Sequence, residues 1–294
     1  MTPATLFVVA TPIGNLSDMT PRAIEVLGAV DLIAAEDTRH SRPLLTHFGI
    51  NTPLHSCHAH NEAAKGGFFL QALQEGKNIA LISDAGTPCI SDPGHLLIQR
   101  AATAGFAVVP VCGASAVVAA LSVSGFDASR FAFIGFFPRK KAPVETAVLE
   151  IAAGDKPVVF YESPKRIAKT IAAFAALAPD VQMCLCNDLT KKFERIYRGT
   201  PAEVAAQLAD NPAAEKGEYA CVVNPAPADA AADEPNPAIA DINDDTHPLE
   251  ARLVTIMLRE NCDLKTAAEI LHQQPPKRRK RDIYAATLRL KSLF

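Results

Sequence analysis

The sequence lacks several features that would define a function at once. Its 294 residues contain no apolar run approaching 18 residues, no GxxxxGK[ST] phosphate loop and no complete GxGxxG. A membrane-spanning helix and the two common glycine-rich nucleotide motifs are therefore not predicted. The chain begins MTPATLFVVATPIGN, which has no basic segment and reaches a Pro-Ile-Gly turn too early for a signal peptide, so we expect a cytoplasmic protein.

Paired cysteines and excess charge are missing as well. The seven cysteines form no CxxC pair, so neither a disulfide framework nor structural zinc is expected, and most should be reduced core thiols. The net charge of -3 argues against a surface that coats nucleic acid, although basic and acidic segments can balance within such a total. A hydrophobic content of 49% over this length predicts a globular protein with more than one domain.

The most informative segment is SDAGTPCISDPG, residues 83–94, which follows an apolar run at 79–82 that is short enough to be a buried strand. Gly86 and Gly94 permit positive φ, while Asp84 and Asp92 place carboxylates at the carboxyl end of that strand. Ligands of open α/β sheets bind at this edge. The alternative is an ordinary loop in which Asp92 caps the next helix, Pro93 starts it, and Asp84 forms a turn within its own loop.

Other predicted strands end in similar segments. Residues 6–10 run into TPIGN, residues 31–35 into EDTRHSR, and residues 107–111 into CGASA. Thr20 and Pro21 predict the start of the first helix, and HAHNE at 58–62 precedes a helix near 64–74. Polar and small residues thus gather at one edge of a predicted sheet. A helix beginning at Ala116 offers N–H groups to a carboxylate or phosphate, or is a plain helix start.

The second half repeats this alternation of strands and helices. Strands are predicted near 131–136, 158–162, 183–186 and 219–224, with helices near 144–152, 166–177 and 201–208. Residues 249–294 carry ten Lys or Arg against five acidic residues. We therefore predict an N-terminal α/β domain at 1–124, a C-terminal α/β domain at 125–224, an acidic Ala/Pro linker at 225–248 and a basic helical module at 249–294.

Four motifs at these spacings resemble those of a known family: TPIGNLSD, AAEDTRHS, SDAGTPCISDPG and FYESPKR. Together they resemble the tetrapyrrole methylase superfamily of S-adenosylmethionine-dependent methyltransferases (class III methyltransferases) over about residues 5 to 225. The EDTR and SDAGTP pair points to the branch that acts on ribosomal RNA. The chain departs from the family pattern in CGASA, which lacks two prolines, in Lys165, which replaces a histidine, and in Asn187-Asp188, which replaces Arg-Glu.

The resemblance implies two α/β domains with S-adenosyl-L-methionine in the cleft between them, a homodimer, and 2'-O-methylation of a cytidine ribose in small-subunit (16S) ribosomal RNA or in the assembled subunit. Mapped onto this sequence, it implies a cofactor site formed by Pro12, Gly14, Asp84, Ala85, Gly86, Thr87, Ser115, Ala116, Tyr161 and Ala220.

A ribose hydroxyl is a weak acid, so a general base or a cation that stabilises the alkoxide would help the transfer. The candidates are Glu36, Asp37, Arg39, His60 and Lys191, with the base unresolved. Glu36 and Asp37 are equally suited to cap a helix or to pair with Arg39. We expect Arg39, His60 and Lys191 to contact the acceptor RNA, because they lie beside different strand ends from the predicted cofactor loops. His58 and His60 are two residues apart with no third ligand at suitable spacing, so no metal is implied.

The tail contains PPKRRKRDIYAATLRL, residues 275–290, which resembles the C-terminal module of the branch that acts on ribosomal RNA. With residues 264–271 it predicts two short helices like a helix-turn-helix. We expect phosphate contacts from Lys277, Arg278, Arg279, Lys280 and Arg281; the alternative is a solvated helix start.

Two other functions stay open from the sequence. One is methylation of a small tetrapyrrole or of a protein side chain within the same superfamily. The other is a non-enzymatic adaptor that binds nucleotides or RNA through its glycine loops.

Overall fold

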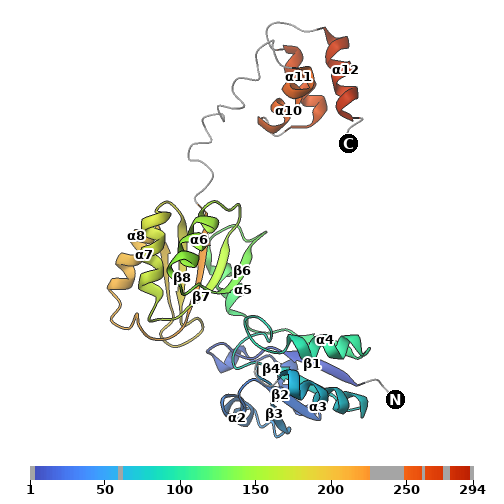
Figure 1. The fold of residues 1–294 in the computed structure, drawn as a ribbon, viewed down its shortest axis with the longest axis vertical. Coiled ribbons are helices and arrows are strands. Elements are labelled where there is room, and N and C mark those ends of the chain that lie inside the picture. Colours follow the sequence, from blue (N-terminus) through green and yellow to red (C-terminus); the bar gives the residue numbers. More distant parts are fainter. Residues whose placement is uncertain (1–3, 59–61, 226–247, 260–261, 274–278, 292–294) are drawn as a thin grey trace. The chain divides into compact units, whose positions relative to one another are not determined.

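The computed structural model of the chain describes residues 4–58, 62–225, 248–259, 262–273 and 279–291 (Figure 1). The chain divides into two compact units, Met1–Ala226 and Pro227–Phe294. Residues 226–247, nearly all of the predicted acidic linker, lie outside the described residues. Within the described part of the chain, no helix has the length and apolar character to cross a membrane.

The first sheet of the larger unit is parallel throughout. Its strand order is β3-β2-β4-β1-β5. The strands are β1 (Thr5–Val9), β2 (Leu32–Ala35), β3 (Leu54–Ser56), β4 (Ile79–Ile82) and β5 (Ala107–Val111). Parallel strands end at a common edge, so the loops that follow them share that edge, as the sequence predicts.

Helices cover both faces of this sheet. They are α1 (Pro21–Ala29), α2 (Thr38–His47), α3 (Glu62–Gln74) and α4 (His95–Thr103), with a short 3-10 helix η1 (Leu16–Asp18) before α1. Side chains alternate along β4: Ala80 and Ile82 pack with residues of α1 and α2, whereas Ile79 and Leu81 pack with residues of α3 and α4. Burial on both faces explains the unbroken apolar run of this strand.

The helices of this sheet agree with the sequence prediction at one point and differ from it at two. The first helix begins as predicted, with Thr20 as N-cap and Pro21 at the first position. The cap of α4 is Gly94, with no side-chain cap bond, so the interpretation of Asp92 as a helix cap is wrong. Helix α2 was not predicted, because its sequence is polar and contains Pro43, which removes a backbone donor from the helix interior.

The second sheet is mixed, with strand order β6-β7-β10-β8-β9. Its strands are β6 (Ala132–Phe136), β7 (Val158–Glu162), β8 (Gln182–Asn187), β9 (Arg195–Gly199) and β10 (Tyr219–Asn224). β6 and β7 are parallel, while β10 pairs antiparallel with both β7 and β8. β9 was not predicted; its alternating exposed and buried residues form an edge strand against β8.

The second sheet also has helices on both faces. One face packs against α6 (Lys141–Ala152), α7 (Ile167–Leu177) and α8 (Pro201–Ala209), with α7 and α8 side by side (Figure 1). The other face packs against α5 (Ala116–Ser124), through Val117, Ala120 and Leu121. Thus α5, which belongs to the predicted N-terminal domain and ends at residue 124, contributes its apolar residues to the core of the second sheet. The boundary at residue 124 stays a prediction.

Most cysteines lie in these cores. Cys57, Cys184, Cys186 and Cys221 are buried, as expected of core thiols, whereas Cys112 is exposed.

The smaller unit contains the two predicted helices and a third helix that precedes them. They are α10 (Leu249–Arg259), α11 (Leu264–Gln273) and α12 (Lys280–Lys291). Leu253, Leu271 and Ile283 contribute one side chain from each helix to a common core. Arg289 of α12 also pairs with Glu250 of α10. The predicted basic helical module is therefore a three-helix unit with its own core.

Candidate functional site

Three loops meet at the carboxyl edge of the first sheet because β1 lies between β4 and β5. Thr11 and Gly86 exchange two backbone hydrogen bonds, with N···O distances of 2.9 and 3.0 Å. Thr87 Oγ1 donates to the carbonyl oxygen of Ala114 at 3.1 Å. The predicted convergence of TPIGN, SDAGTP and CGASA is therefore confirmed.

A cavity of about 380 Å³, here called the central cavity, opens beside these loops. Its walls come from loops of the first sheet, the start of α5 and strand ends of the second sheet, all within the larger unit. It brings together ten of the residues predicted from the sequence: Glu36, Asp84, Ala85, Gly86, Thr87, Ser115, Ala116, Tyr161, Lys191 and Ala220.

The first loop enters the cavity through Ile13 rather than through the predicted Pro12 and Gly14, which are not among its lining residues. A Cβ at Gly14 would overlap Cγ of Lys191, so Gly14 allows this loop to pack against the lysine stem. Gly86 has a φ of +80°, and a Cβ there would lie 3.2 Å from Cγ2 of Ile13. Both glycines thus permit close packing between loops, and Gly86 also needs its backbone conformation.

Three carboxyl groups line one side of the central cavity: Glu36, Asp84 and Asp92. Asp84 Oδ1 accepts a hydrogen bond of 3.1 Å from the backbone N–H of Asp37, across two strand ends. This cross-loop bond replaces the turn within its own loop that was the alternative for Asp84. Burial, followed by the neighbouring Asp84 carboxylate, raises the pKa of Glu36.

Asp92 lines the cavity at the edge of the sheet where the sequence placed its carboxylate, although it was not among the predicted cofactor or catalytic residues. Burial first, and then the negative charge of Glu36, raise its pKa to about 6, although a hydrogen bond with Ser83 acts in the opposite direction. The preceding Ser91 has a φ of 70°, which is uncommon for a residue with a side chain. Ser91 Oγ lies against Gly135 of β6, where a Cβ would be 3.3 Å away. The loop thus presents Asp92 to the cavity while contacting the second sheet.

Asp37 and Arg39 do not line the central cavity. Asp37 is the N-cap of α2 and forms an ion pair of 2.7 Å with Arg39, whose side chain is 89% exposed. Hydrogen bonds from Arg39 hold the pKa of Asp37 well below its usual range. Of the two interpretations of Asp37, the structure supports capping and ion pairing. His60 lies outside the described residues, and the described part of the chain contains no cluster of three His, Cys, Asp or Glu residues suited to a metal.

The second sheet supplies an aromatic and a buried ion pair. Tyr161 of β7 lines the cavity, and burial, followed by the charges of Asp92 and Glu218, raises its pKa to about 12. Glu162 is buried beside it, pairs with Arg166 at 3.1 Å and accepts a hydrogen bond of 2.7 Å from Thr170. Glu162 and Arg166 belong to the FYESPKR motif, and the two bonds fix Glu162 in the wall of the cavity. Lys165, in the same motif, is exposed.

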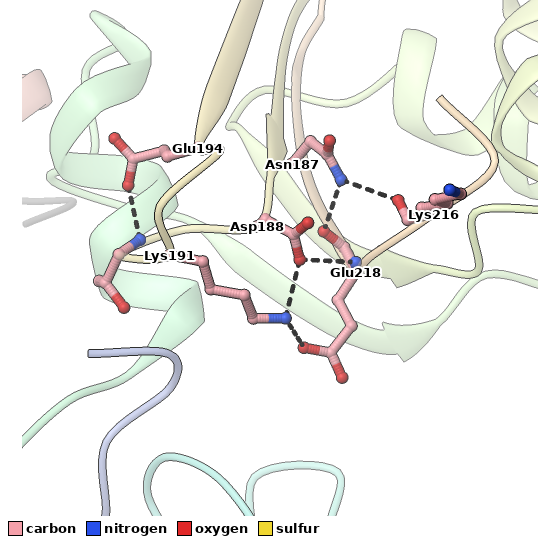
Figure 2. Close-up of polar contacts among 7 residues, drawn as sticks. Asn187, Asp188, Lys191, Glu194, Lys216 and Glu218 are labelled. Atoms are coloured by element: carbon pink, nitrogen blue, oxygen red, sulfur yellow. Dashed lines mark hydrogen bonds and ion pairs between the residues drawn. The ribbon is translucent and has the colours of Figure 1, made fainter. Parts of the chain in front are cut away.

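Lys191 lies at the end of the second sheet between two acidic residues (Figure 2). Its Nζ is 2.7 Å from Asp188 Oδ1 and 3.0 Å from Glu218 Oε2, and all three residues line the central cavity. Burial by itself would lower the pKa of Lys191, but the hydrogen bonds to the two carboxylates more than offset this and raise it. Lys191 is therefore charged, and it lies in the same cavity as the loops predicted to bind the cofactor, whereas the sequence analysis expected it apart from them.

Backbone contacts fix this cluster (Figure 2). The amide of Asn187 donates to the carbonyl oxygens of Lys216 and Glu218, at 3.3 and 3.4 Å. Asp188 has a φ of 52°, and its carboxylate occupies the space that a Cβ of Gly217 would need. Asn187 and Asp188 are the residues that depart from the family pattern. They join β8 to the start of β10 by side-chain bonds that span about thirty residues of sequence.

The predicted RNA-binding run lies in the smaller unit. Arg279, Lys280 and Arg281 are exposed at the start of α12, whereas Lys277 and Arg278 lie outside the described residues. Arg281 pairs with the adjacent Asp282 at 3.4 Å. The described part of the run thus presents cations on the surface of this unit, while its contacts with RNA stay a prediction.

Comparison with known proteins now identifies the family. The family model described as Tetrapyrrole (Corrin/Porphyrin) Methylases matches residues 5–205, which include the whole first sheet, strands β6 to β9 of the second sheet and most of the residues that line the central cavity. This chain belongs to the tetrapyrrole methylase family. The resemblance stated from four motifs is therefore confirmed.

Among tetrapyrrole methylases, several similar relatives share one name. The chain is 41% identical over 270 residues to Ribosomal RNA small subunit methyltransferase I of Xylella fastidiosa (strain Temecula1 / ATCC 700964), which covers 92% of this chain and 94% of the relative. A protein of the same name from Pseudomonas aeruginosa is 46% identical over 224 residues, with 76% of this chain and 79% of the relative covered.

Solved structures share the tetrapyrrole methylase fold at much lower identity. Diphthine synthase matches with a TM-score of 0.57 at 14% identity, covering 75% of this chain and 90% of that one. The methyltransferase CobJ matches with a TM-score of 0.56 at 17% identity, covering 76% and 95%. These similarities establish a fold of two sheets, each covered by helices, and C-terminal helices follow them in the present chain.

Proposed function

We propose that this chain transfers a methyl group from S-adenosylmethionine to the 2'-hydroxyl of a cytidine ribose in small-subunit ribosomal RNA. The observation that carries the proposal is the similarity to a relative named Ribosomal RNA small subunit methyltransferase I, which extends over 92% of this chain and 94% of the relative. The match therefore includes the C-terminal region as well as the methylase fold.

The central cavity fits S-adenosylmethionine in size and charge. Its volume of about 380 Å³ lies within the usual range for small-ligand sites. Glu36, Asp84, Asp92, Asp188 and Glu218 line it with a single lysine among them, Lys191. An excess of carboxylates attracts cations. S-adenosylmethionine, when bound, supplies an electrophilic methyl group on a positively charged sulfonium.

The chain's own residues would hold this cofactor mainly by shape. Gly86, Ala85 and Ala116 provide small side chains and backbone groups, against which flat or extended parts of a ligand can pack. Tyr161 and Ala220 provide the facing surface from the second sheet. Such fixed walls favour catalysis because orienting the reacting atoms near contact distance contributes much of the acceleration in a transfer of this kind.

Proton removal from the ribose hydroxyl falls to carboxylates of the cavity. Glu36 and Asp92 both have raised pKa values, and a base whose pKa lies near the working pH is the most effective. Lys191 provides a positive charge at the same cavity, although Asp188 and Glu218 balance it. Arg39 is exposed at the start of α2 and does not line the cavity. It is therefore better placed to contact RNA phosphate than to contact the reacting atoms.

The proposed partners are small-subunit ribosomal RNA, free or in the assembled subunit, and a second copy of the chain in a homodimer. The C-terminal unit would add RNA affinity through Arg279, Lys280 and Arg281. An enzyme that modifies ribosomal subunits would act in the cytoplasm.

Cofactor binding and acceptor preference can be tested together. Calorimetry should detect S-adenosylmethionine binding to the purified chain. Radiolabelled methyl groups should then pass to small subunits that lack the modification, and not to a uroporphyrin-type tetrapyrrole. Transfer to the tetrapyrrole alone would reject the RNA proposal while keeping the methylase fold, and binding without transfer to any acceptor would support an adaptor instead.

A further inference from the structure

The smaller unit contains a hollow of its own, which is not part of the central cavity. An open groove of about 860 Å³ runs between α11 and α12, and its residues include Lys265, Glu269 and His272 of α11 and Lys280, Arg281 and Tyr284 of α12. Its charged groups are three cations of Lys and Arg and one carboxylate. The groove therefore favours an anionic ligand.

Tyr284 is the unusual residue of this groove. Its side chain is 65% exposed, although burying an aromatic ring is normally favourable. The core side of α12 is formed by Ile283, Ala286 and Leu290, so Tyr284 is not needed to hold the three helices together. Leu288, one helical turn further, is 50% exposed. Tyr284 and Leu288 thus form an apolar strip on the surface of a basic helix.

Cations border this strip at one end. Lys280 lies one helical turn before Tyr284, and spacing of four residues places them on the same face of α12. Lys265 lies on the facing helix α11 and lines the same groove. Arg281 contributes less, because Asp282 pairs with it at 3.4 Å. The groove thus combines the exposed aromatic ring of Tyr284 with the positive charges of Lys280 and Lys265 beside it.

We infer that this groove binds an unpaired nucleotide of RNA, whose base stacks on Tyr284 while its phosphates contact Lys280 and Lys265. The inference rests on the proposed RNA substrate and adds a contact outside the central cavity. An aromatic ring beside lysines is the combination that single-stranded nucleic acids require, because every base has a flat face and every linkage a negative charge. An acidic protein segment would use the cations but not the exposed ring face.

The test is the affinity of the full-length chain for a short single-stranded oligoribonucleotide, measured by fluorescence anisotropy without cofactor. Tyr284→Ala should weaken binding at least fivefold, whereas Tyr284→Phe, which keeps the ring face, should bind within about twofold of the parent. Lys280→Gln should weaken binding and reduce the slope of log affinity against log salt by about 0.7. Lys169→Gln, which removes an exposed lysine from α7, is the matched charge control and should leave both quantities unchanged.

Two results would overturn the inference. The first is unchanged affinity in Tyr284→Ala, and the second is an equal loss in Tyr284→Phe, which would assign the effect to the hydroxyl rather than to stacking. A fully paired duplex of the same sequence should be insensitive to Tyr284→Ala, and an equal loss there would also reject a stacked base. Because Tyr284 is exposed, circular dichroism should show unchanged helix content in both variants. Failure of the proposed function would instead appear as absent methyl transfer, with this RNA affinity intact.

Discussion

Replacing Asp92 with asparagine should stabilise the protein while lowering its activity. In the native structure burial, followed by the negative charge of Glu36, raises the pKa of Asp92 to about 6. In an unfolded chain the pKa returns to about 3.9. The native state therefore binds more protons than the unfolded state between these pH values, and its free energy of unfolding falls as the pH rises from about 4 to about 6. Above about pH 6 the ionised side chain is a cost that asparagine removes.

The size of this effect follows from the pKa. A pKa raised from about 3.9 to about 6 corresponds to about 3 kcal/mol as an upper limit. Asp92 is only half-buried, so solvent screening reduces the expected gain to about 1–2 kcal/mol at pH 7. In a unit of this size that gain raises the melting temperature by about 3–6 °C. At pH 4 the gain should nearly vanish, because Asp92 is then protonated in the native state and half protonated in the unfolded state.

Calorimetric or fluorescence-monitored melting of the parent and Asp92→Asn at pH 4 and pH 7 measures this difference. Asp180→Asn, which changes an exposed carboxylate in the loop after α7, is the matched control and should shift neither curve by more than about 0.5 kcal/mol. Methyl transfer by Asp92→Asn should fall at least tenfold if its carboxylate accepts the ribose proton. A destabilised variant at pH 7, or a gain equal at both pH values, would refute the electrostatic reasoning.

Three further predictions concern the cavity and the tail. Gly86→Val should abolish S-adenosylmethionine binding in calorimetry, because a side chain there meets Ile13; Gly76→Val, at a similar positive φ but with open space around it, controls for backbone strain and should bind normally. Asp188→Asn should weaken the hold on Lys191, so that its pKa, followed by NMR, falls; an unchanged pKa would show that Glu218 suffices. Replacing residues 277–281 by neutral residues should flatten the salt dependence of RNA affinity with unaltered cofactor affinity, and an unchanged slope would leave the run as a solvated helix start.

Most of the residues that the first sheet contributes to the cavity could be predicted from the sequence, because each of them lies in a motif directly after its strand. Each motif there follows a short apolar strand, and parallel strands bring their loops to one edge whatever the details of packing. Asp84, Gly86 and Ser115 were found in this way. Ile13 was missed because the motif pointed to the unusual residues beside it, Pro12 and Gly14, whereas an apolar side chain in a turn carries no local signal.

The second-sheet side depends on contacts between segments far apart in the chain. Lys191 was among the predicted candidates, but Glu218 joins it through the antiparallel pairing of β8 with β10, which no local pattern encodes. Asp92 was placed at the carboxyl edge of the first sheet, but helix capping stayed open as an alternative because Asp before Pro typically caps a helix, and only the folded loop shows Gly94 in that place. The exposed ring of Tyr284 was likewise visible only once α12 was packed, because Ile283 beside it faces the core.

The central claim is that this tetrapyrrole methylase modifies small-subunit RNA, and mapping the transferred methyl group tests it most directly. Small subunits lacking the modification should be incubated with the purified chain and S-adenosylmethionine labelled in the methyl group, and the RNA then digested to nucleosides and separated by chromatography with mass detection. The account predicts label in 2'-O-methylcytidine at a single position of the small-subunit RNA, and none when Gly86→Val replaces the parent. Label on a base, in large-subunit RNA or in protein would contradict it.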